Sequence, residues 1–145
     1  MGIKITVLKR ADAPTLRDIR GLLSQVHTDS SESKGTMLEL QNLVKDKNIV
    51  AVVAKDGVRI VGMALLYIIA NVGRRKGHVE EVVVDGGYRG KGIGRNLMKK
   101  LIAAARQKKL KNLYLTSRPT RVAANALYKD IGFEKKETNV YCLKV

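Results

Sequence analysis

Residues 79–95 read VEEVVVDGGYRGKGIGR, and this stretch decides the fold. Its first part, residues 79–84, is rich in β-branched valine, which is typical of a buried strand. Five glycines follow within residues 86–94, and after them apolar residues recur at a helical spacing. The stretch therefore predicts a strand, a glycine-rich loop and a helix. Such a loop aims backbone N–H groups at the positive end of a helix, which suits a diphosphate.

The spacing of the glycines distinguishes between the known kinds of phosphate-binding loop. Arg89, Lys91 and Arg95 add positive charge beside them. A Walker A motif is excluded because Lys91 is followed by Gly92, and the dinucleotide fingerprint is excluded because the glycines are spaced G-x-G-x-G. The loop resembles the R/Q-x-x-G-x-G/A motif of the GNAT acetyltransferase superfamily, through Arg89, Gly90, Lys91, Gly92, Ile93 and Gly94.

A second feature of the same superfamily lies downstream, where residues 123–128 read AANALY and residues 131–133 read IGF. The resemblance covers nearly the whole chain and implies a single N-acetyltransferase domain over residues 1–145. It implies an α/β fold with a mixed, largely antiparallel central sheet flanked by helices, in the order β-α-α-β-β-β-α-β-α-β-β. It also implies an acyltransferase that moves an acetyl group from acetyl-CoA to a primary amine, by direct attack in a ternary complex.

Local patterns agree with this order of elements. Four helices are expected. The first begins at residue 12 or 13, the second covers residues 37–45, the third follows the glycine-rich loop, and the fourth runs from residue 119 or 120 to Gly132. The expected strands are residues 2–9, 49–54, 58–69, 77–84, 112–117, 133–137 and 141–144, with turns at residues 55–57 and 71–77 and a hairpin through residues 138–139. Residues 27–36 are polar and small, as in a solvated connection or a loop that selects the substrate.

Composition limits the classes of protein and partner. No apolar run reaches the length of a membrane span and no signal peptide is recognised, so we expect a cytoplasmic protein without a membrane partner. Cys142 is the single cysteine, which favours a reducing compartment, and its apolar neighbours favour a packed thiol. The net charge of +15 fits solvated helix faces together with a cleft for anionic coenzyme A. We do not expect nucleic acid as a partner, because no aromatic platform accompanies the charge, and we expect no metal cofactor. A homodimer is one alternative for the assembly.

Acetyl transfer requires three kinds of group. The amine needs a base, the tetrahedral intermediate needs a backbone N–H, and the leaving thiolate gains from a proton donor. The resemblance assigns the donor role to Tyr128, and it implies that Asn125 and the backbone of Val82, Val83 and Val84 bind the pantetheine arm; each also suits a structural role. The residues expected to bind the diphosphate are Arg89, Gly90, Lys91, Gly92, Ile93, Gly94 and Arg95.

The base is open among three residues. Glu80 and Glu81 lie on opposite faces of the strand unless a bulge intervenes, and His78 shares a face with Glu80. In the histone-acetylating branch of the superfamily a glutamate falls near the position of His78. Each of the three also suits an ion pair at a strand edge, and proton transfer through water is a further alternative.

The acceptor is open as well. Residues 77–84 resemble a strand of the glucosamine-6-phosphate N-acetyltransferases, whereas residues 117–121 are unlike that group and resemble uncharacterised bacterial GNAT proteins and protein N-terminal acetylators. The acceptor is accordingly a small molecule, a peptide N-terminus or a lysine. Two other functions are alternatives: a GNAT-fold protein that binds acyl-CoA without turnover, and a basic nucleic-acid-associated module with salt-sensitive binding.

Overall fold

The computed structural model describes residues 2–27 and 35–145, and the chain divides into two compact units, Met1–Leu115 and Thr116–Val145. Most of the segment expected to connect two helices or to select the substrate, residues 28–34, lies outside the described residues.

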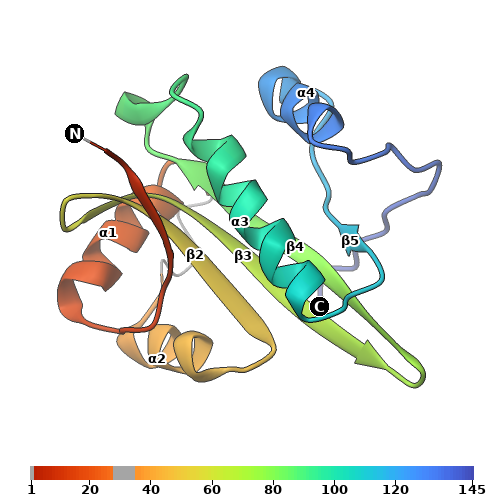
Figure 1. The fold of residues 1–145 in the computed structure, drawn as a ribbon, viewed down its shortest axis with the longest axis horizontal. Helices are drawn as coiled ribbons and strands as arrows, with labels where there is room; N and C mark the ends of the chain where they lie inside the picture. The colour runs from red at the N-terminus through yellow and green to blue at the C-terminus, as the bar shows by residue number, and fades with distance from the viewer. Residues whose placement is uncertain (1, 28–34) are drawn as a thin grey trace. The chain divides into compact units, whose positions relative to one another are not determined.

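The first unit is built on a sheet in the order β1-β2-β3-β4-β5 (Figure 1). Neighbours from β1 to β4 pair antiparallel, whereas β5 is parallel to β4. The predicted α/β class with a mixed, largely antiparallel sheet is therefore confirmed. The strands are β1 (Lys4–Val7), β2 (Ile49–Asp56), β3 (Arg59–Asn71), β4 (Arg74–Val84) and β5 (Leu113–Tyr114).

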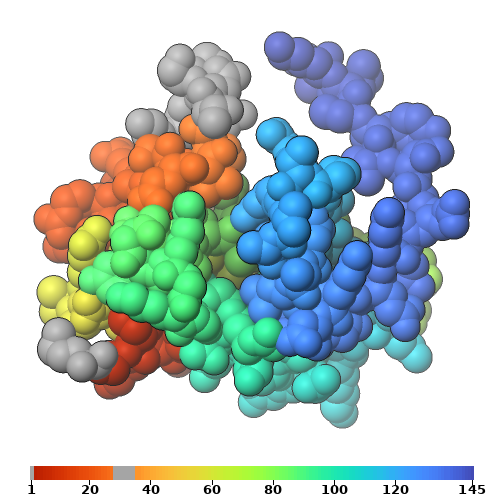
Figure 2. Space-filling view, turned by 90° about the horizontal axis from the view of Figure 1, so that it is seen from above, coloured from red at the N-terminus to blue at the C-terminus, as the bar shows by residue number. Residues whose placement is uncertain are grey.

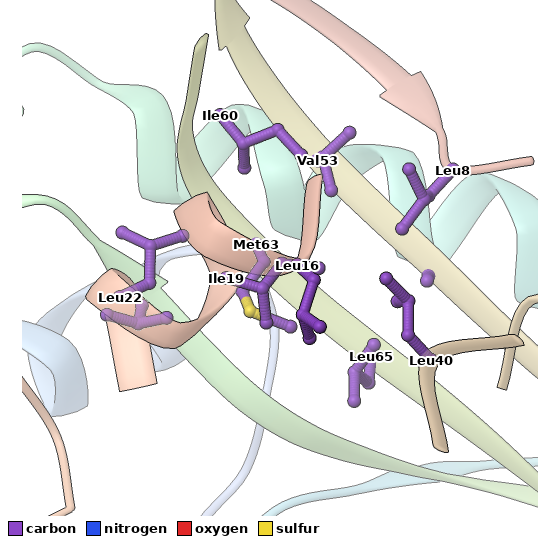
Figure 3. Packing of buried hydrophobic residues seen from close by; sticks show 11 residues of the cluster. Leu8, Leu16, Ile19, Leu22, Leu40, Val53, Ile60, Met63 and Leu65 are labelled. Atoms are coloured by element: carbon purple, nitrogen blue, oxygen red, sulfur yellow. The ribbon is translucent and has the colours of Figure 1, made fainter. Parts of the chain in front are cut away.

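Helices cover both faces of this sheet. Side chains of α1 (Ala13–Leu23) and α2 (Met37–Lys45) meet alternate residues of β2 and β3 in one core cluster, which Figure 3 shows from close by. On the other face, Leu97 of α3 (Ile93–Gln107) lies against Gly62 of β3, where a Cβ would come within 3.2 Å of the leucine side chain. Asp12 caps α1 by accepting the N–H of Thr15 at 2.9 Å.

The boundaries of β1, β2 and β3 differ from the expected ones by one or two residues, and those of β4 and β5 by up to three. β4 begins at Arg74 rather than at residue 77, because polar residues continue the ladder as far as the pair Asn71–Arg74. β5 is shorter than the predicted residues 112–117. It approaches β4 closely at Gly77, where a Cβ would lie 2.5 Å from the side chain of Leu113, so a larger residue there would displace leucine side chains.

The second unit contains α4 (Val122–Asp130), which ends before Gly132 at φ 111°. The predicted hairpin over residues 133–137 and 141–144 is wrong, because the structure has no strand there. Cys142 is exposed, so the prediction of a packed thiol is also wrong. The large apolar side chains that this segment exposes are Val140, Tyr141, Leu143 and Val145. No helix in either described part of the chain is long and apolar enough to cross a membrane.

Candidate active site

The glycine-rich loop connects β4 to α3. After a 3₁₀ turn, η1 (Gly86–Tyr88), both Gly90 and Gly92 adopt φ 78°, the left-handed region that glycine occupies without strain. A Cβ at either glycine would meet no atom within 4 Å, so the backbone conformation rather than the space requires glycine. Gly92 is the N-cap of α3 and gives the first N–H groups of this helix no side-chain acceptor. The loop therefore has the geometry that an anionic diphosphate needs.

The last residues of β4 have an open edge. Within the described residues, β5 pairs only with the middle of β4, and Asp85 donates its N–H to β3 at 2.8 Å. Because N–H directions alternate along a strand, the N–H groups of Val82 and Val84 point away from β3, while the side chain of Val83 is buried. Arg89 Nε donates to the Val84 carbonyl on this edge at 3.1 Å, which folds the loop back onto the strand.

Tyr88 positions a charge of the loop. Its hydroxyl donates to Asp56 Oδ2 at 2.5 Å, and this hydrogen bond is the largest of the effects that raise the pKa of Tyr88. Lys91 Nζ lies 5.2 Å from the centre of the Tyr88 ring, and the guanidinium carbon of Arg59 lies 5.9 Å from it. The side-chain charge of Lys91 thus lies close to the Tyr88 ring within the loop. Tyr88 was not among the residues expected at the site, since only its position within the loop could have indicated it.

Glu81 occupies a β-bulge in β4. Met63 pairs with Val83 and Leu65 pairs with Glu80, so one residue of β3 faces two residues of β4. Glu81 takes φ 53°, a left-handed conformation that is uncommon for a residue with a side chain. The sequence left undecided whether a bulge interrupts the strand at Glu80 and Glu81. The bulge is present, and it determines where the carboxylate of Glu81 lies.

The three candidate bases gather on the face of the sheet that α1 and α2 cover. Paired residues of an antiparallel ladder share a face, so Glu80 shares the face of Leu65, and His78 shares that of Tyr67. His78 Nε2 lies 3.4 Å from Glu80 Oε1. The pKa of Tyr67 is raised first by burial and then by the charges of Glu81 and Glu80, so these groups form one electrostatic cluster.

The chain after α1 contacts both the bulge and the loop. His27 Nε2 lies 3.1 Å from each carboxylate oxygen of Glu81. Gln25 Nε2 donates to Asp85 Oδ1 at 2.8 Å, while Gln25 Oε1 accepts the N–H of Gly86 at 3.0 Å. The Gln25 hydrogen bond is the largest of the effects that lower the pKa of Asp85. Figure 2 shows the two regions side by side, in orange and green. Gln25 was not expected at the site, and His27 was expected only as the first residue of the segment 27–36, because no local pattern marks contacts between such distant residues.

A cavity of about 190 Å³ opens beside Glu81. It penetrates the core between the two helices and the sheet, where the side chains point toward one another in Figure 3. Its apolar walls include Leu16, Ile19, Leu40, Val53, Met63 and Leu65. The described residues that bring polar side chains to its lining are Thr36, Glu39, Tyr67 and Glu81.

In the second unit, 6% of the surface of Tyr128 is exposed. Burial raises the pKa of its hydroxyl, and the charge of Arg121 acts in the opposite direction, so the group stays protonated at neutral pH. The Tyr128 ring meets Phe133 edge-on, with centroids 6.0 Å apart. Asn125 Nδ2 donates to the carbonyl oxygens of Arg118 and Arg121 at 2.9 Å each, which stabilises the start of α4.

Known proteins share this fold. Residues 16–133 match the family described as acetyltransferase (GNAT) family. Glucosamine 6-phosphate N-acetyltransferase of Trypanosoma brucei brucei is 29% identical over an alignment of 143 residues that covers 93% of this chain and 91% of that protein. The crystal structure of a Trypanosoma brucei acetyltransferase superposes with a TM-score of 0.79 at 28% identity, covering 99% of this chain and 100% of that one. AAC(6')-Iy in complex with the bisubstrate analogue CoA-S-monomethyl-acetylneamine has a TM-score of 0.81 at 15% identity, covering 100% and 99% of the two chains.

The chain belongs to the acetyltransferase (GNAT) family, as the resemblance of the loop predicts. It is an N-acetyltransferase that uses acetyl-CoA.

Proposed function

We propose that Glu81 is the general base of this N-acetyltransferase, and that it acts in direct acetyl transfer to a primary amine within a ternary complex. The observation that carries the proposal is the position of Glu81, which a left-handed bulge holds and which His27 contacts through both carboxylate oxygens. Strained residues of this kind persist where the surrounding structure over-determines them, often at functional sites. His78 and Glu80 contact each other instead, and Glu80 is exposed.

In this proposal the amine nitrogen loses a proton to Glu81, directly or through one water, and attacks the thioester carbon. A backbone N–H on the open edge of β4 stabilises the oxyanion that forms. When the tetrahedral intermediate collapses, the carbon–sulfur bond breaks, and Tyr128 donates its proton to the leaving thiolate. The raised pKa of Tyr128 supports this role, because it keeps the hydroxyl protonated at neutral pH.

The remaining contacts with acetyl-CoA divide between backbone and charge. The N–H groups of Val82 and Val84 bind the pantetheine arm, for which their direction is suitable, and Asn125 contacts the same arm. The diphosphate lies at the start of α3, where the loop amides fix its position and Arg89, Lys91 and Arg95 supply charge. The support is the shape of the loop at Gly90 and Gly92. The family match spans both units, and we assign them to one domain, residues 1–145.

The acceptor, assembly and location are parts of the same proposal. An amino sugar phosphate is one acceptor candidate, because a relative with 29% identity carries that name; a peptide N-terminus, a lysine and other small amines are the others. A homodimer would cover the apolar side chains that residues 140–145 expose. A cytoplasmic location is supported by the single exposed thiol of Cys142, which a reducing compartment tolerates.

A panel of amines tests the function. Peptides, polyamines, amino sugars and aminoglycosides are incubated with the protein and acetyl-CoA, and the free thiol of CoA is followed over time. We expect thiol release that depends on at least one amine and that saturates with acetyl-CoA. Tight binding of acetyl-CoA without amine-dependent release would favour the alternative of a non-catalytic acyl-CoA-binding protein.

A further inference from the structure

We infer that the acceptor is a primary amine whose neighbouring carbon carries a compact hydrocarbon group, and that this group enters the cavity beside Glu81. The chemistry is that of a peptide N-terminus beginning with leucine or methionine, and it differs from that of a sugar phosphate. The inference rests on the proposed function, because it takes Glu81 as the group that receives the amine proton.

The size and the walls of the cavity point to a hydrocarbon occupant. The residues around it are core residues, with 3% of Leu65, 4% of Met63 and 7% of Ile19 exposed. Empty space in such a core destabilises a protein, and apolar cavities of roughly 150 Å³ stay dry and accept molecules as large as benzene. The cavity of about 190 Å³ is therefore large enough for a leucine or methionine side chain, which would gain hydrophobic contacts there.

The charges at the cavity favour an ammonium group over a phosphate. Glu39 and Glu81 are the charged residues in its described lining, and both are acidic. Glu39 is held at α2 by the N–H of Thr36, which donates to it at 2.7 Å. The guanidinium of Arg20 is not part of this lining; it donates to the carbonyl of Gly35 at 2.9 and 3.1 Å. A phosphate in this cavity would face two carboxylates, whereas an ammonium group would be attracted by both.

The position of Glu81 relates the amine to the cavity. The same carboxylate that would accept the amine proton also lines the cavity. An amine nitrogen in hydrogen-bond contact with Glu81 consequently has its neighbouring carbon near the opening, and a side chain on that carbon reaches the apolar walls. The His27 contact leaves further acceptor positions on the carboxylate, since each oxygen carries two lone pairs.

The test compares three acceptors at saturating acetyl-CoA: L-leucinamide, glycinamide and glucosamine 6-phosphate. We expect kcat/KM for L-leucinamide to exceed that for each of the other two by at least about tenfold, the effect typical of a few methylene groups in an apolar pocket. Ala51→Leu adds bulk to the cavity wall, so it should remove most of that preference while glycinamide is affected less than threefold. The matched control is Ala103→Leu, at an exposed position of α3 away from the cavity, which should leave all three values unchanged.

A binding measurement keeps the test decisive if Ala51→Leu does not fold. Calorimetry on the wild-type protein with bound CoA should detect L-leucinamide at lower concentration than glucosamine 6-phosphate. Equal or better use of glycinamide or of glucosamine 6-phosphate would overturn the inference and leave N-acetyl transfer intact. Turnover of none of the three, with turnover of a larger charged amine, would also overturn it. Failure of every amine in the wider panel would instead overturn the proposed function.

Discussion

His27 Nε2 lies 3.1 Å from both carboxylate oxygens of Glu81, although the two residues are 54 positions apart in the chain. A carboxylate held through both oxygens has a fixed orientation, and its backbone is fixed as well by the bulge at φ 53°. The two constraints come from different parts of the first unit. Together they distinguish Glu81 from the other candidate bases and define the first two predictions.

Glu81→Gln should lower kcat by roughly 100-fold or more, because an amide of the same shape cannot accept the amine proton. The measurement is steady-state CoA release with the best amine of the panel. Glu80→Gln is the matched control, since Glu80 is the neighbouring exposed carboxylate, and its kcat should stay within about threefold of the parent. The reverse ranking of these two variants would assign the base to Glu80.

His27→Ala should lower kcat by about tenfold and leave KM for acetyl-CoA unchanged, because His27 contacts the carboxylate of the proposed base, Glu81. His27→Gln keeps a hydrogen-bond donor and should restore part of the loss. A kcat of His27→Ala equal to that of the parent would show that the contact has no role in turnover.

Gly92→Val should weaken acetyl-CoA binding by at least tenfold, because a β-branched residue strongly resists φ 78° and distorts the loop amides. Gly73→Val is the control. Gly73 has φ 83° in the β3–β4 turn and, like Gly92, leaves open space around a Cβ. The control should lose similar stability on thermal unfolding but keep its calorimetric affinity for acetyl-CoA. Equal affinity of both folded variants would exclude the loop as the diphosphate site.

Lys91→Ala should reduce acetyl-CoA affinity by about 1–2 kcal/mol, the range for a partly solvated charge-assisted hydrogen bond. The Lys91 ammonium belongs to the loop and lies 5.2 Å from the centre of the Tyr88 ring. Lys99→Ala removes the same charge from an exposed position of α3 and should cost far less. Complete loss of binding in Lys91→Ala would mean that side-chain charge, rather than the loop amides, dominates.

Tyr128→Phe should keep the fold and lower kcat by roughly ten- to a thousand-fold, with little change in KM for acetyl-CoA. The pKa of Tyr128 is raised above the ordinary value of 10.0, so the hydroxyl stays protonated through neutral pH. The hydroxyl loses its proton only at alkaline pH. The folded state binds this proton more tightly than the unfolded state. The resulting stability is therefore present below pH 10.0 and is lost as the pH rises through the folded pKa. The contribution of Tyr128 to this alkaline loss should be absent in Tyr128→Phe, while the contributions of Tyr67 and Tyr88, whose pKa values are also raised, remain. A kcat within twofold of the parent would remove Tyr128 from the chemistry.

Local patterns in the sequence were sufficient for most elements of the fold. The helix over residues 37–45 has the predicted bounds, since a capping box at Thr36 and Glu39 marks its start. The C-terminal hairpin was wrong because alternating apolar residues indicate a face, whereas strand formation also requires a partner strand, which no local signal supplies. β4 began earlier than expected because polar residues continue its ladder with β3 without any apolar signal.

The candidate site was predictable to the extent that it depends on glycine. Gly90 and Gly92 indicate the shape of the loop because their conformation suits no other residue well. The bulge at Glu81 carries no such mark, since glutamate does not indicate a positive φ. Gln25 and His27 reach the site through contacts between distant parts of the chain, which periodicity and composition do not encode.

Glu81 is a supernumerary residue in the pairing of β3 with β4. If it were deleted, Val82 would face Ala64, between the pairs Val83–Met63 and Glu80–Leu65, and the ladder would run without interruption. The outward direction of the Val82 amide would not change, because the alternation on either side of the bulge is already in phase. The proposed base is thus an insertion in an otherwise regular hairpin, and a single-residue deletion separates the chemistry of the site from the scaffold that presents the cofactor-facing amides.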